Sequence, residues 1–135
     1  MRRPAIFDRT SPSDLIRAVL ELGLARLRLG SQHARASIEA SAAKAIELNV
    51  NQSALVERVA FVIPRVAARL PWRADCLVQA LAAQHWLSSH QVFTTLTLGV
   101  PRHMPTNFEA HAWLTAGDRI VTGGDVSGYA PLNRP

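Results

Sequence analysis

The chain has 135 residues, and its single cysteine, Cys76, and the histidine His111 are the side chains best suited to chemistry. A thiolate is a strong nucleophile, and a nearby imidazole can take up and return its proton. Asp75 directly precedes Cys76 and is a typical helix N-cap, so the sulfur is expected near the unpaired amides and the positive dipole end of a helix. Cysteines in apolar helices and histidines between alanines are also common core residues, so residue type alone leaves both interpretations open.

A catalytic imidazole also needs a group that fixes its tautomer, and two aspartates follow His111. Asp118 falls in the expected hairpin turn, more than about 20 Å from His111 at ~3.3 Å per residue, and is rejected. With 117–118 as the central turn residues, position 124 pairs opposite His111, and a bulge at Gly123-Gly124 could turn the Asp125 carboxylate toward the imidazole. Asp125 is therefore the predicted third member. A backbone carbonyl or another polar group is the alternative, and an Asx turn is the structural role of Asp125.

The remaining histidines and glycines give no cofactor or metal site. His85 and His90 lie five positions apart on an expected helix, so they point about 140° apart, which is poor geometry for a shared metal. His103 falls in an expected loop next to the hairpin that holds His111; this loop could line a substrate groove, but solvent exposure is the usual state. Gly123-Gly124 lacks the surrounding pattern of a phosphate-binding loop. We therefore expect no cofactor and no metal.

The elements that must position these residues follow from hydrophobic spacing and capping. Helices are predicted over about 11–29, 31–48, 51–70 and 76–89, with the third capped by Asn51-Gln52-Ser53 and kinked or broken near Ile63 by Pro64. The fourth has no formally charged side chain and is expected to be buried. Alternation predicts a strand over 93–100, a loop over 101–107, and a hairpin of 108–115 and 119–122. The predicted fold class is α+β.

Length and charge bound the class of protein. The length predicts one domain, with 1–50 as peripheral helices and 51–135 as the core that carries the site. The formal net charge of +5 arises entirely in residues 1–70, where arginines are spread over helices and not clustered with aromatics. This pattern favours a solvated or protein-binding face over nucleic acid. No signal peptide or membrane span is expected, and with one thiol a reducing, cytoplasmic location fits best.

An ordered set of motifs resembles the transglutaminase-like leader peptidases of lasso-peptide biosynthesis, the B2 proteins. The resemblance covers residues 55–132 and is specific as an ordered set, although each motif alone is weak. The motifs are, in the order of that family, Pro71-Trp72-x-x-x-Cys76-Leu77, Leu98-Gly99-Val100, Ala110-His111-Ala112-Trp113-Leu114 and Gly117-Asp118-Arg119-Ile120-Val121-Thr122-Gly123-Gly124.

The resemblance implies a papain/transglutaminase-type fold with Cys76 as nucleophile and His111 as general base. It implies a cysteine peptidase that removes the leader from a ribosomally made precursor peptide, after which a separate ATP-dependent cyclase, a further candidate partner, closes the macrolactam ring. A leader-binding B1 protein is implied as a partner in trans. We expect it to dock on the basic first half of the chain, which includes Arg58, Arg65 and Arg69. The resemblance also implies an aspartate about a dozen residues after the histidine, as is usual in the fully catalytic members, and Gly123 occupies that position here.

Other function classes remain open at this point. A non-catalytic binding or scaffold protein with the same fold is suggested by the glycine in place of that aspartate. An acyl transferase or transglutaminase could use the same cysteine and histidine, because a thioester can react with an amine as well as with water. A basic, helical nucleic-acid-binding protein is a more distant alternative.

Overall fold

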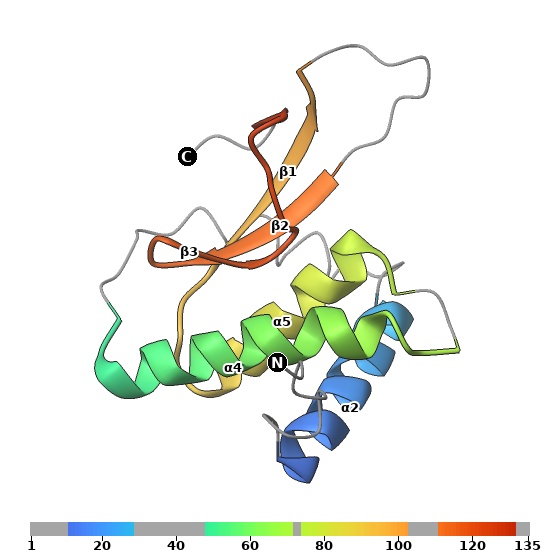
Figure 1. The fold of residues 1–135 in the computed structure, drawn as a ribbon, viewed down its shortest axis with the longest axis vertical. Coiled ribbons are helices and arrows are strands. Elements are labelled where there is room, and N and C mark those ends of the chain that lie inside the picture. Colours follow the sequence, from blue (N-terminus) through green and yellow to red (C-terminus); the bar gives the residue numbers. More distant parts are fainter. Residues whose placement is uncertain (1–10, 29–47, 72–73, 103–110, 132–135) are drawn as a thin grey trace, which may run out of the picture.

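The computed structural model describes residues 11–28, 48–71, 74–102 and 111–131, and these form helices followed by an antiparallel sheet (Figure 1). The sheet has four strands in the order β3-β2-β1-β4. The α+β prediction is confirmed. The elements are α2 (Pro12–Arg28), α4 (Val50–Ala67), α5 (Cys76–Ser89), β1 (Thr95–Pro101), β2 (His111–Ala116), β3 (Arg119–Thr122) and β4 (Tyr129–Pro131).

Some sequence predictions fall where the structure gives no description. The helix predicted over 31–48 lies almost wholly outside the described residues, as do His103 and the first residues of the strand predicted over 108–115. The strand predicted over 93–100 is found as β1, displaced by one or two residues toward the C-terminus. The short strand β4 was not predicted.

Helix α4 differs from its prediction at both ends. It begins at Val50 because Asn49, not Asn51, is the N-cap: the Asn49 side chain accepts from the Gln52 amide, and the Gln52 side chain accepts from the Asn49 amide. At the other end, the helix continues through Pro64 to Ala67, so of the kink or break predicted near Ile63 the break is wrong. Buried residues on both sides of the proline hold this last turn in the core.

The proline has a local consequence inside α4. Pro64 has no amide hydrogen, so the carbonyl oxygen of Ala60 lacks the donor that residue i+4 normally supplies in a helix. Both residues line a cleft that is described below. The carbonyl of one cleft-lining residue therefore lacks its usual helical partner.

Helix α5 is the centre of the core, as its lack of charged residues predicted. It contacts α2 and α4 on one side and β1, β2 and β3 on the other. Its buried side chains include Val78, Leu81 and Leu87, which pack with Leu22 of α2 and Leu114 of β2. The helix thereby fixes its own first residue, Cys76, against the sheet.

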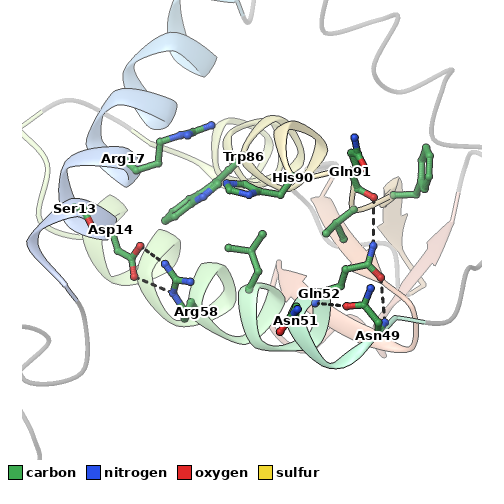
Figure 2. Close-up of a pocket in the computed structure, with 13 residues that line it drawn as sticks. Ser13, Asp14, Arg17, Asn49, Asn51, Gln52, Arg58, Trp86, His90 and Gln91 are labelled. Atoms are coloured by element: carbon green, nitrogen blue, oxygen red, sulfur yellow. Dashed lines mark hydrogen bonds and ion pairs between the residues drawn. The ribbon is translucent and has the colours of Figure 1, made fainter.

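Two buried carboxylates attach α2 to the rest of the helical layer. Asp14 accepts from Arg58 of α4 at 3.1 Å (Nε) and 2.5 Å (Nη2), and Figure 2 shows the guanidinium facing this carboxylate. The hydrogen bond to Asp14 raises the pKa of Arg58. Glu21 accepts from Arg17 Nε and contacts Nδ1 of His85 on α5, each at 2.7 Å.

Arg58→Ala is expected to lower the free energy of unfolding by about 1–3 kcal/mol, because the buried carboxylate of Asp14 would lose its bidentate partner. Urea denaturation followed by circular dichroism measures the change. Arg69→Ala is the matched control, since Arg69 is exposed near the end of the same helix. Equal losses in the two variants would show that the ion pair contributes nothing specific.

None of the helices within the described ranges is both long enough and apolar enough to cross a membrane.

Candidate active site

Cys76 is the first residue of α5, and its side chain is partly exposed. Asp75 caps the helix as predicted: its carboxylate accepts from the Val78 amide at 3.2 Å, and its carbonyl accepts from the Gln79 amide at 3.0 Å. The amides of Cys76 and Leu77 come before the first helical acceptor and have no partner within the helix. The sulfur is therefore attached to a helix end that presents main-chain donors.

His111 is the first residue of β2, and its ring orientation is fixed by the main chain. Its Nε2 lies 2.7 Å from the carbonyl oxygen of Gly123. A carbonyl oxygen can only accept, so Nε2 carries the hydrogen, and in the neutral ring Nδ1 keeps a free lone pair. The ring also packs against Tyr129, with centroids 4.7 Å apart, and Trp113, at 5.9 Å. The imidazole is held in the tautomer that can accept a proton at Nδ1.

Cys76 and His111 line the same cleft, a cavity of about 600 Å³ between α4, the start of α5 and strand β3. Figure 1 shows the first turn of α5 close to the start of β2, in agreement with the contacts between these elements. The described lining residues are Ala60, Pro64, Cys76, Gln79, His111, Arg119, Ile120, Val121, Thr122, Gly123 and Gly124.

Asp125 is placed differently from the sequence prediction. Its carboxylate is exposed and accepts from the Ser127 amide at 3.0 Å, a contact that lowers the pKa of Asp125. This is the Asx turn that was its alternative role. The hydrogen-bond partner of the imidazole is the carbonyl of Gly123, a backbone group of the kind considered as the alternative to the carboxylate.

The local register explains this placement. The turn at Gly117 and Asp118 is present as predicted, but the bulge falls at Val121 and not at the two glycines, because Thr115 pairs with Ile120 and Leu114 with Thr122. Regular pairing ends at Thr122. Gly123 and Gly124 then adopt φ angles of +108° and +66° and turn the chain out of the sheet. This turn presents a carbonyl to His111 and carries Asp125 away into solvent.

Two features of the site were missed by sequence reasoning. Tyr129 contacts the imidazole from β4, a three-residue strand that ends in a proline and gives no strong sequence signal. The specific role of the Gly123 carbonyl was also missed. The paired glycines did signal an unusual backbone, but the direction of a single carbonyl depends on tertiary packing.

Thr122 carries a buried hydroxyl with no hydrogen-bond partner among the described residues, and the residue is 2% exposed. An unpaired buried hydroxyl is unfavourable, and valine has nearly the same shape. Thr122→Val is therefore expected to raise the free energy of unfolding by about 1 kcal/mol. Thermal and urea denaturation measure this change, and Thr115→Val serves as a control because the Thr115 hydroxyl donates to the Thr95 carbonyl. Destabilisation by Thr122→Val would mean that its hydroxyl is satisfied.

A second cavity of about 830 Å³ lies between α2, α4 and the end of α5 (Figure 2). Its polar groups bind mainly to one another: Asp14 to Arg58, Asn49 to Gln52, and Gln52 to the carbonyl of Gln91. It contains His90 but no nucleophile or acid–base pair comparable to Cys76 and His111. Over the described ranges, no three side chains of His, Cys, Asp or Glu come together as a metal site. The smaller cleft is therefore the candidate active site.

A helix-borne cysteine that shares a cleft with a strand-borne histidine is the arrangement of papain- and transglutaminase-type enzymes. The sequence model of the transglutaminase-like superfamily matches residues 18–134. The chain belongs to this superfamily. Searches of curated proteins and of solved structures gave no significant match.

Proposed function

We propose that this chain is a cysteine peptidase that removes the leader from a ribosomally made lasso precursor peptide. Membership of the transglutaminase-like superfamily supports thiol-based acyl chemistry of the peptidase or transglutaminase kind. The observation that carries the proposal is the common cleft of Cys76 and His111, with the imidazole held through Nε2 so that Nδ1 is free. The leader-peptidase assignment adds the sequence resemblance to the lasso B2 family.

In the proposed reaction, His111 Nδ1 takes the proton of the Cys76 thiol, and the sulfur attacks the carbonyl carbon of the leader–core peptide bond. Main-chain amides at the start of α5 stabilise the oxyanion of the tetrahedral intermediate. The C–N bond then breaks as the imidazolium gives its proton to the leaving amine, which leaves a thioester on Cys76. Water, deprotonated at His111, attacks the thioester, and the carboxylic acid and the free thiol are released.

The test uses the intact chain, a candidate precursor peptide and a leader-binding partner of the B1 type. The expected result is time-dependent cleavage at one bond, prevented by prior alkylation with iodoacetamide, with a free carboxylate at the new C-terminus by mass spectrometry. An amide product in the presence of an added amine would instead identify an acyl transferase, the second candidate that the superfamily match favours. Cleavage that survives complete alkylation of Cys76 would overturn both.

We propose the basic surface of α4 as the docking face for the B1–leader complex. Arg58 is bound to Asp14, and Arg65 lies over the Phe61 ring and donates to the Phe61 carbonyl, so reversing the charge of either residue also disturbs the fold. Arg69 is exposed and gives the cleaner test. Arg69→Glu is expected to weaken binding of the complex about fivefold, in line with an exposed ion pair. Calorimetry measures the affinity, with Arg69→Gln as the control variant. An unchanged affinity of Arg69→Glu would reject this surface as the docking face.

A further inference from the structure

Two elements, one a helix and one a strand, provide walls of the candidate cleft. One wall is α4, through Ala60 and Pro64, and the other is β3, of which every residue lines the cleft. Strand β3 is an edge strand in the sheet that the described residues form, paired on one side with β2. His111, which shares the cleft with Cys76, contacts Gly123 just beyond the last residue of β3, and Arg119 is the first residue of this strand.

Both walls carry main-chain groups that lack a regular secondary-structure partner within the described residues. The outer edge of β3 has no strand neighbour within the described sheet, and such an edge is a template for an added strand. Across the cleft, the Ala60 carbonyl lacks its helical donor because of Pro64. A peptide lying between the walls can therefore satisfy its own main-chain groups without any particular side-chain sequence.

Among the described residues that line the cleft, Arg119 is the one that is a lysine, arginine, aspartate or glutamate. Its guanidinium is anchored by Glu57 of α4, with Nη2 to Oε2 at 3.1 Å, and the Arg119 side chain remains 49% exposed. Guanidinium has five N–H donors in a planar fork, so one ion pair leaves donors for a second carboxylate.

We propose that a peptide substrate binds as an added strand along β3 and that Arg119 selects for an acidic side chain three or four residues from the scissile bond. The spacing follows from the strand itself, since the four residue steps from Arg119 to Gly123 span about 13 Å and a bound extended peptide has the same rise per residue. The inference rests on the proposed peptidase function, because it names the substrate class of the same cleft.

The experiment measures protection of Cys76, the only thiol of the chain, against iodoacetamide. The competitors are acetylated, amidated nonapeptides of serine, threonine and alanine with Glu, Gln or Lys at the centre. Because the variable residue is at the centre and both ends are blocked, such peptides can bind in several registers and in either chain direction. The test therefore does not depend on the direction in which the substrate chain runs. The protein variant is the charge swap Arg119→Glu/Glu57→Arg, which keeps the ion pair but reverses the sign of the charge in the cleft.

In the natural protein, the Glu peptide is expected to protect at about fivefold lower concentration than the Gln peptide, and the Lys peptide to be the weakest. In the charge swap, this order is expected to reverse, and added salt should reduce it in both proteins. N-methylation of alternate residues in the Glu peptide should abolish protection, because it removes the amides that pair with an edge strand.

The same order of peptides in both proteins, or no protection by any of them, would overturn the inference. Full protection by the N-methylated peptide would overturn its strand-addition part. These outcomes are separable from failure of the proposed function, which is measured by cleavage and by the product formed. Intact cleavage without charge selection rejects the inference alone, and charge-selective protection without cleavage rejects the peptidase alone.

Discussion

Cys76→Ala is expected to lower kcat/KM for peptide cleavage by at least about 10³-fold, the scale on which loss of a nucleophile acts. No other described side chain of the cleft can form a thioester. Cys76 is partly exposed in the first turn of α5, and its removal leaves the Asp75 cap in place, so the fold should be retained. Cleavage of the precursor peptide, measured by mass spectrometry in the presence of its partner, gives the result.

The control for this prediction compares the single variants of Cys76 and His111 with the double variant. His111→Ala should reduce cleavage to a similar extent, and the double variant should be no worse than either single one, because a nucleophile and its base act as a unit. Circular dichroism and unfolding curves verify that each variant is folded. A folded Cys76→Ala protein that still supports leader removal would identify the chain as a scaffold.

Gly123→Ala is expected to lower kcat by about 100-fold, the cost of displacing a catalytic group by about 1 Å, and to destabilise the fold by about 2–4 kcal/mol. A Cβ at this position would lie 2.3 Å from the Cβ of Trp113, and the φ angle of +108° disfavours any L side chain. The chain must shift to relieve the contact, and the carbonyl that holds His111 shifts with it.

Gly124→Ala is the matched control for Gly123→Ala. Gly124 also has a positive φ, +66°, but a Cβ there would meet nothing within 4 Å. Gly124→Ala should therefore lower the free energy of unfolding by only about 1 kcal/mol, the cost of a positive φ for an L residue, and leave kcat nearly unchanged. The Nε2–H resonance of His111 in proton NMR spectra reports the contact directly, and it should move in Gly123→Ala alone. Equal kinetic effects in the two variants would show that the Gly123 carbonyl does not position the imidazole.

Sequence patterns sufficed where local rules determine structure. The Asp75 cap, the uncharged helix behind it and the Gly117-Asp118 turn follow from capping, burial and turn chemistry, and all are present. The glycine of the Leu98-Gly99-Val100 motif also has a physical reason. A Cβ on Gly99 would lie 2.6 Å from the Trp113 ring, so the indole needs this glycine to pack over β1.

The groups that surround His111 could not be predicted from such local rules. The register depends on a bulge at Val121, and shifting the pairing by one residue changes which group lies opposite the histidine. The predicted position of Asp125 assumed that regular strand pairing continues to this residue, but the pairing ends at Thr122. The predicted start of α4 was wrong for a similar reason, because several polar residues near this helix end can act as N-caps. Only the reciprocal hydrogen bonds between Asn49 and Gln52 show that Asn49 is the cap.

The neutral character of the Gly123 oxygen has a consequence for the conditions under which the protein works. An aspartate in this role would contribute a negative charge next to the imidazolium and would lose that charge in acid. A peptide oxygen neither ionises nor takes up a proton in the ordinary range, so the anchoring of His111 persists at any acidity that leaves the chain folded. Acid therefore cannot release the imidazole by protonating its partner, as it could if that partner were a carboxylate.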